Sequence, residues 1–181
     1  MKKSKIGELR LILKSCSPCA KSAERMKSMN LLLGSIALIF SFSAWADFVG
    51  DVIGVADGDT ITVLDADKVQ HKVRLAEIDA PEKAQAFGNK SKQALSALVH
   101  GKQVLVVEQG QDKYKRTIGR IYQSNVDVNA EQVKQGMAWV YRKYSKDKNL
   151  LPLEDQAKSQ RLGLWIDIDP TPPWEWRKLK K

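Results

Sequence analysis

Hydrophobic and polar positions alternate along two neighbouring stretches of the chain. Phe48–Val55 and Thr60–Leu64 are rich in β-branched residues, and Asp57-Gly58 between them is typical of a hairpin turn. A third strand is expected over Val69–Ile78, where the pattern stops at Asp79-Ala80-Pro81. The first part of this region therefore predicts three consecutive antiparallel strands.

The following residues change to helical spacing and back. Over Ser91–Val99 the apolar positions recur every three or four residues, and Gly101 is a plausible C-cap. Beyond this helix the pattern predicts two strands and two shorter helices, and mostly irregular structure from Pro170 onward. These four elements span Val104–Val107, Ile118–Tyr122, Val128–Gln135 (ended by Gly136) and Leu153–Arg161 (ended by Gly163).

This order of elements indicates a mainly β fold with helices, of the α+β class. Three strands, a helix and two strands are the arrangement of the OB fold, a five-stranded antiparallel barrel. With the two later helices, the expectation is a five-stranded OB-fold barrel with three α-helices. Residues 47–181 contain no internal repeat and no Gly/Ser linker, and about 135 residues suit one such domain.

The first 46 residues have the pattern of a targeting segment. A basic residue, Lys27, precedes the apolar run Leu31–Phe42, and Ala44-Trp45-Ala46 resembles a small-x-small cleavage site before Asp47. We expect a signal peptide cleaved after Ala46, which would make the protein secreted or periplasmic. The run is shorter than the roughly 20 residues that span a bilayer, although an uncleaved anchor remains the alternative.

The segment before the apolar run is unusually long for a signal peptide. Translation from Met26 or Met29 would give a conventional short basic region, which we hold as a hypothesis. Both cysteines, Cys16 and Cys19, lie in residues 1–46, so the expected mature chain has no cysteine and no disulfide.

Charge is distributed unevenly along the chain. The net charge is +9, but residues 1–46 carry eight basic and two acidic residues, a net of +6. Residues 47–181 carry 22 basic and 19 acidic residues, a net of +3. Bulk charge therefore gives only minor support for a polyanionic partner, and the placement of individual residues matters more.

Three polar clusters carry the candidate chemistry. They are Asp57–Thr60, Arg74–Glu82 and Asp112–Thr117. Arg74 and Asp79 are five residues apart, so a regular strand would place them on opposite faces. Bringing both to one site requires a bulge or an early end of the strand.

Together the clusters contain the groups needed for phosphate-ester hydrolysis. Two aspartates, a backbone carbonyl and water are hard oxygen ligands suited to Ca²⁺. Glu82 could act as a general base on water, and two arginines could bind a phosphate and stabilise its developing charge. Such a site needs no histidine, so His71 and His100 are expected at the surface.

These residues resemble the motifs of the staphylococcal (micrococcal) nuclease family. The motifs occur in the same order and at compatible spacing, and the similarity extends over roughly Val49 to Trp165. They comprise Asp57-Gly58-Asp59-Thr60, Arg74-Leu75, Ile78-Asp79-Ala80-Pro81-Glu82, Asp112-Lys113-Tyr114 with Arg116, Asn129 to Gly136-Met137-Ala138, and Gly163-Leu164-Trp165.

The resemblance implies an OB barrel with three helices and a Ca²⁺-dependent hydrolase of DNA and RNA that leaves 3′-phosphate ends. We also expect a monomer that acts on single-stranded or locally open nucleic acid, without stable membrane association after cleavage. The implied roles are metal ligands at Asp59, Asp79 and the carbonyl of Ala80, a general base at Glu82, phosphate binding at Arg74 and Arg116, and nucleotide contacts at Lys113, Tyr114 and Tyr144.

Four features depart from the family pattern. Lys115 replaces the glycine usual before the second arginine, and Glu77 adds a carboxylate that we expect to face solvent. Arg142 stands where the staphylococcal enzyme has a tyrosine, which favours phosphate attraction over base packing, and the loop after Glu82 is shorter. None removes a proposed ligand, base or arginine, so an active enzyme is the leading hypothesis. The alternatives are a non-catalytic nucleic-acid-binding OB module and a membrane-tethered form of the same enzyme.

Overall fold

The computed structural model describes residues 47–179 of the chain. The signal peptide expected over residues 1–46, with Cys16 and Cys19, lies outside the described residues. No helix in the described part is long and apolar enough to cross a membrane.

The described residues form short strands and helices in the expected order. The strands are β1 (Phe48–Val55), β2 (Thr60–Asp65), β3 (Gln70–Leu75), β4 (Ile78–Asp79), β5 (Gln103–Gln111), β6 (Thr117–Gln123), β7 (Val126–Asp127) and β8 (Trp139–Val140). The helices are α1 (Gly88–Val99), α2 (Val128–Lys134), α3 (Leu150–Ser159) and α4 (Pro173–Leu179), with a 3-10 turn, η1, over Gly163–Ile166.

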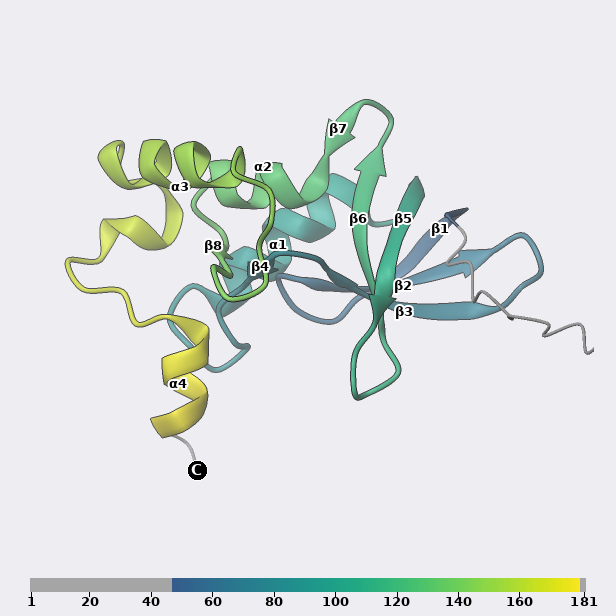
Figure 1. Cartoon of the computed structure of the whole chain (residues 1–181), viewed down its shortest axis with the longest axis horizontal. Helices are drawn as coiled ribbons and strands as arrows, with labels where there is room; N and C mark the ends of the chain where they lie inside the picture. Colours follow the sequence, from purple (N-terminus) through teal and green to yellow (C-terminus); the bar gives the residue numbers. More distant parts are fainter. Residues whose placement is uncertain (1–46, 180–181) are drawn as a thin grey trace, which may run out of the picture. The chain divides into compact units, whose positions relative to one another are not determined.

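Five of the strands close into a barrel. Antiparallel pairing gives the order β3-β2-β1-β5-β6, and a parallel pairing of β3 with β6 closes the ring (Figure 1). β7 extends the sheet beyond β6, while β4 and β8 pair separately. The expected five-stranded OB barrel is confirmed.

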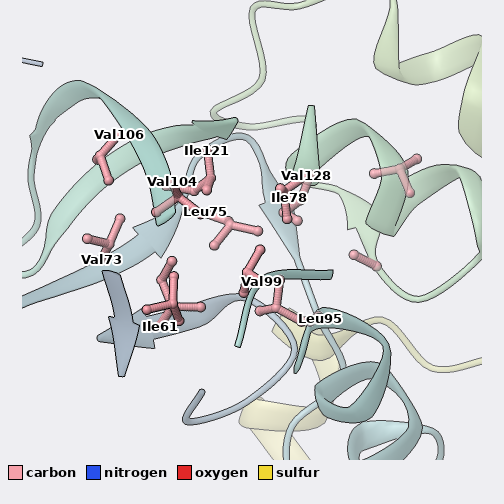
Figure 2. Close-up of a cluster of buried hydrophobic side chains, with 14 of the residues drawn as sticks. Ile61, Val73, Leu75, Ile78, Leu95, Val99, Val104, Val106, Ile121 and Val128 are labelled. Atoms are coloured by element: carbon pink, nitrogen blue, oxygen red, sulfur yellow. The ribbon is translucent and has the colours of Figure 1, made fainter. Parts of the chain in front are cut away.

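The core lies inside the barrel and continues beneath the helices. Alternate positions of the strands point inward, and α1, α2 and α3 add their buried faces to the same cluster (Figure 2). Its fully buried side chains include Ile61, Val73, Leu75, Ile78, Leu95, Val99, Val106, Ile121, Val128 and Leu150.

Several boundaries differ from the expectation for local reasons. The strand expected over Val69–Ile78 ends at Leu75, because a turn with a positive φ at Glu77 separates it from β4. α3 begins at Leu150, before Pro152, because proline is tolerated in the first turn of a helix. Gly101 and Gly136 both have positive φ just after helices, as expected of C-terminal glycines.

The tail was expected to be mostly irregular, and this is wrong for Pro173–Leu179. These residues form α4, a fourth α-helix in the described part of the chain. Pro173 is its first residue, where a missing backbone N–H costs nothing, and it is buried. Aromatic contacts with distant residues hold α4, so the local sequence gave little signal for it.

Asn129 joins α2 to the barrel through buried hydrogen bonds. Its Oδ1 accepts from the backbone N–H of Ile121 at 3.0 Å. Its Nδ2 donates to the carbonyls of Ala76 and Gly119, at 2.9 and 3.3 Å. One amide therefore satisfies backbone groups on β6 and in the β3–β4 turn, at the base of the candidate site.

We predict that Asn129→Ala lowers the free energy of unfolding by roughly 2–5 kcal/mol, because buried backbone groups lose their partners. Urea denaturation followed by circular dichroism measures the change. The control is Gln93→Ala on the exposed face of α1, which should change stability by less than about 0.5 kcal/mol. Similar effects of the two substitutions would contradict the structural role of Asn129.

Candidate functional site

A tight turn brings Arg74 and Asp79 to the same site. β3 ends at Leu75 and β4 begins at Ile78, with Glu77 at φ 66° between them. Arg74 Nη2 donates to Asp79 Oδ1 at 2.7 Å, and Nη1 donates to the carbonyl of Ile78 at 3.3 Å. The early strand end expected from the spacing is therefore present, because β3 ends four residues before Asp79.

Asp59, the residue just before β2, lies next to this pair. β2 runs antiparallel to β3, and the register pairs Thr60 with Arg74, so the residue before β2 lies where β3 ends. Asp59 Oδ2 accepts from the backbone N–H of Ala80 at 2.9 Å and lies 3.3 Å from Arg74 Nη2. Arg74 therefore lies against both expected metal-binding carboxylates.

The hairpin turn before Asp59 is held by close packing against α1. A Cβ on Gly58 would lie 1.9 Å from the hydroxyl of Ser91, so only glycine fits. The carbonyl of Gly58 accepts from Gln132 Nε2 at 2.8 Å. Gly58 therefore allows the hairpin turn to form and also lets that turn pack closely against α1 and α2.

Both carboxylates are buried, and their environment affects their charge. Burial raises the pKa of Asp59, and the positive charge of Arg74 opposes this change. Burial by itself would lower the pKa of Arg74, but the charges of Asp59 and Asp79 outweigh it and raise the pKa. The side chain of Asp79 is 0% exposed. Buried carboxylates are costly without compensating positive charge, so the site favours a cation.

The oxygen-rich site suits a hard divalent cation. Asp59 and Asp79 supply carboxylate oxygens, and Ala80 between Asp79 and Pro81 supplies a carbonyl. No cluster of three or more His, Cys, Asp or Glu side chains placed to hold a metal occurs in residues 47–179. Of the expected ligands, the structure brings the carboxylates of Asp59 and Asp79 together around Arg74.

Arg177, which the sequence did not mark as a site residue, contacts this cluster from α4. Arg177 Nη2 donates to Asp79 Oδ2 at 2.6 Å, and Nη1 donates to Asp79 Oδ1 at 3.2 Å and to Glu82 Oε1 at 2.7 Å. Burial would lower the pKa of Arg177, but hydrogen bonds to Asp79 and Glu82 outweigh it and raise the pKa. A positively charged group therefore already lies against the carboxylates.

Glu82 lies beside the buried pair but is open to solvent. Its side chain is 40% exposed, and its backbone N–H donates to Gln85 Oε1 at 3.1 Å. The short loop after it returns onto the start of α1, where a Cβ on Gly88 would lie 2.0 Å from the carbonyl of Glu82. Glu82 is therefore partly open to water and lies close to the buried Asp79 through their shared partner Arg177.

Arg116 ends the loop between β5 and β6. β6 runs parallel to β3 with Ile118 opposite Arg74, and Arg116 lies just before the start of β6, two residues from that position. Its Nε donates to Asp112 Oδ2 at 2.8 Å, while Asp112 Oδ1 accepts from the backbone N–H of Arg116 and Tyr114. Asp112 therefore shapes the loop and orients its arginine.

Lys115 occupies the loop position where the family has glycine. Its φ is 62°, in the left-handed region that glycine adopts most readily. The backbone N–H of Lys115 donates to the carbonyl of Asp112 at 2.9 Å, which closes the turn. The loop thus keeps a glycine-like conformation with a lysine in it.

The residues expected to contact the nucleotide are largely exposed. Lys113 Nζ lies 4.9 Å from the ring centre of Tyr114, and Arg116 lies 5.6 Å from the same ring. Tyr144 is 57% exposed and meets Tyr141 edge to face, with ring centres 4.7 Å apart. An exposed aromatic ring beside basic groups can stack on a nucleobase.

Arg142 forms an ion pair that the sequence did not predict. Its Nη2 donates to Glu154 Oε2 at 2.7 Å, and Glu154 also accepts from the backbone N–H of Val140 and from Lys158. Glu154 is fully buried, so Arg142 compensates a buried charge. The side chain of Arg142 is 62% exposed, so it pairs with Glu154 and remains open to solvent.

Glu77 does not face solvent as expected. Its Oε1 accepts from the backbone N–H groups of Lys146 and Asp147, at 2.7 and 3.1 Å, and its Oε2 lies 3.4 Å from Arg120 Nη1. Arg120, also missed from the sequence, donates to Asp127 and Asp147. The turn that presents Asp79 is thereby fixed to the segment after β8.

The histidines have no contact with the site residues described above. His100 is exposed, and His71 Nε2 lies 2.7 Å from Asp65 Oδ2. Hydrogen bonding to His71 lowers the pKa of Asp65. The expected surface position is confirmed for His100, while His71 is half-buried.

Comparison with known proteins agrees with this geometry. A family model described as staphylococcal nuclease homologue matches residues 72–167, a range that ends before α4. An uncharacterised endonuclease of Haemophilus influenzae is 43% identical over 86% of this chain and 89% of its own length. A micrococcal nuclease of Shigella flexneri is 41% identical over 86% of this chain and 95% of its own.

We predict that Glu77→Ala lowers the free energy of unfolding by about 1–3 kcal/mol, because the backbone N–H groups of Lys146 and Asp147 lose their acceptor. Glu77→Gln, which keeps an acceptor oxygen, should cost less. Urea denaturation of both variants measures the difference. Unchanged stability of Glu77→Ala would show that this contact does not hold the turn.

Proposed function

The chain belongs to the staphylococcal nuclease family, and from this premise we propose that it is a calcium-dependent endonuclease. It hydrolyses phosphodiester bonds of DNA and RNA and leaves 3′-phosphate ends. The observation that carries the proposal is the pair of buried carboxylates, Asp59 and Asp79, held around Arg74 with Glu82 beside them. The OB-barrel fold by itself does not require this group of charged residues.

Asp59, Asp79 and the carbonyl of Ala80 would hold the Ca²⁺ ion. Their oxygens are the hard donors that calcium prefers, and Arg177 already lies at Asp79 as a cationic stand-in. When bound, the ion supplies positive charge that stabilises the anionic phosphate during attack.

Glu82 takes the proton from the attacking water. Its half-exposed carboxylate is accessible to water and lies within reach of the site. The water oxygen forms a bond to phosphorus while the bond from phosphorus to the 5′ oxygen breaks. The leaving oxygen takes up a proton, which leaves a 5′ hydroxyl on one fragment and a 3′ phosphate on the other.

Arg74 and Arg116 bind the phosphate. Guanidinium groups match phosphate oxygens in paired hydrogen bonds and stabilise the extra charge of the transition state. Lys113 and Tyr114 would contact the nucleotide's terminal phosphate and sugar, while Tyr144 would stack on a base. Stacking needs an unpaired base, so we propose a preference for single-stranded or locally open substrate.

The non-catalytic alternative explains less of the site. A protein that only binds nucleic acid has no need of buried carboxylates, which cost stability and repel phosphate. Asp59 and Asp79 are both buried, and Glu82 lies next to them. Hydrolysis gives each of these groups a function.

We place this activity outside the cytoplasm. The apolar run and cleavage motif before Asp47 favour export and removal of residues 1–46, which leaves a chain with a net charge of +3. The processed protein is proposed to be a monomer without stable membrane association.

Purified protein should fragment single-stranded DNA with Ca²⁺ and not with a chelator. Glu82→Gln should lower turnover by roughly 10²–10⁴ while substrate binding survives, because the general base is lost. Gel analysis of products and a filter-binding assay measure the two properties. Glu108→Gln on β5 is the matched control and should retain activity. Fragmentation that persists in chelator, or is absent in both conditions, would contradict the mechanism.

Arg116→Lys tests the role of the second arginine. We predict a loss of turnover of about tenfold or more, because an ammonium group cannot form the paired hydrogen bonds of a guanidinium. Steady-state kinetics on a short single-stranded DNA measure the change, and Arg161→Lys on the surface is the control. Unaltered turnover in Arg116→Lys would reject the phosphate-binding role.

A further inference from the structure

The C-terminal helix lies against the candidate active site. We propose that α4 is an inhibitory latch, in which Arg177 occupies the cation position at Asp79 and Glu82 and Ca²⁺ binds only when Arg177 leaves. The inference rests on the proposed function, since it assumes that these carboxylates belong to a Ca²⁺ site.

Arg177 engages both oxygens of Asp79. Its Nη2 donates to Oδ2 at 2.6 Å, and its Nη1 lies 3.2 Å from Oδ1, which also accepts from Arg74 at 2.7 Å. Asp79 is fully buried, and both of its oxygens already accept from a guanidinium. An ion bound by Asp79 therefore requires Arg177 to move.

The charge balance of the closed state supports mutual exclusion. Asp59, Asp79 and Glu82 face Arg74 and Arg177, so guanidiniums compensate most of the negative charge. A divalent ion added beside both arginines would be repelled by them, whereas an ion that replaces Arg177 restores the compensation. The guanidinium of Arg177 and Ca²⁺ thus compete for the same carboxylates.

The same side chain also blocks the proposed base. Arg177 Nη1 donates to Glu82 Oε1 at 2.7 Å, which occupies an oxygen that would accept the proton from water. A single residue therefore masks a metal ligand and the general base together. Removal of Arg177 from the site would release both functions at once.

Aromatic packing holds α4 in the closed position. Trp174 stacks on Tyr141 with an interplanar angle of 1° and ring centres 5.4 Å apart, and it meets Trp139 edge to face at 5.7 Å. Gln85 Nε2 donates to the carbonyl of Thr171 at 2.6 Å just before the helix. α4 has seven residues, too few to be stable alone, so the helix depends on this docking.

The docking surface of Trp174 adjoins the proposed base-binding ring. Tyr141, on which Trp174 stacks, contacts Tyr144 edge to face. Figure 1 shows α4 joined to η1 by an extended connection, separate from the other helices. The latch can therefore change position without rearrangement of the barrel.

The test is calorimetric titration of Ca²⁺ into protein recovered after expression of the complete chain, without nucleic acid. Arg177→Gln should bind Ca²⁺ about tenfold or more tightly than the wild type, because the competing guanidinium is gone. Trp174→Ala should also bind more tightly, since it weakens docking without altering a site residue. Lys178→Gln is the matched control, because it removes a neighbouring exposed charge paired with Glu175 and should leave affinity unchanged.

Arg177→Lys separates competition from general charge repulsion. It keeps the positive charge but loses the paired donors, so its affinity for Ca²⁺ should lie between those of the wild type and Arg177→Gln. Wild-type affinity in Arg177→Gln, or an equal gain in Lys178→Gln, would overturn the latch. Tighter binding in Arg177→Gln with reduced turnover at saturating Ca²⁺ would overturn a purely inhibitory role and assign Arg177 to phosphate binding.

The two proposals fail in different ways. If the wild type cleaves DNA only with Ca²⁺ and Arg177→Gln binds the ion no better, the latch is wrong and the proposed function stands. If neither protein binds Ca²⁺ nor cleaves DNA, the proposed function itself is wrong.

Discussion

The ion pair between Arg74 and Asp79 is the interaction on which the candidate site depends. Two carboxylates are buried at the end of the barrel, and without positive charge between them their burial would cost several kcal/mol. The pair forms because β3 stops at Leu75 and a residue with positive φ, Glu77, reverses the chain. Arg120 and Asn129 hold that turn to the surrounding elements. The buried charges of the site therefore depend on both the barrel and the turn at Glu77.

The same charge requirement explains the position of the C-terminal helix. With two carboxylates against Arg74 and Glu82 nearby, a second cation lowers the electrostatic free energy of the site, and Arg177 provides it from α4. The contact joins residues almost a hundred positions apart and depends on Trp174 stacking on Tyr141. Either a metal ion at Asp79 or the docked Arg177 can compensate the negative charge of the carboxylates. This makes the helix a natural place for regulation of activity.

The strands and most helices could be predicted because their signals are local. Alternating β-branched residues defined β1 and β2, and helical spacing followed by glycine defined α1 and α2. The site residues Asp59, Arg74, Asp79 and Glu82 were found from motif order, and the structure brings them together. Arg177 and the inward position of Glu77 could not be predicted, because each is determined by partners distant in sequence. The proline before Trp174 was the available signal for α4, although proline also ends helices.

We propose above that Asp59 and Asp79 form a cation site that serves catalysis. Its most direct test is calorimetric titration of the wild type, Asp59→Asn and Asp79→Asn with Ca²⁺ in the absence of nucleic acid. We expect one ion per chain in the wild type and a large loss of affinity in both variants, since each loses a charged oxygen ligand. Equal Ca²⁺ binding in all three proteins would contradict the claim.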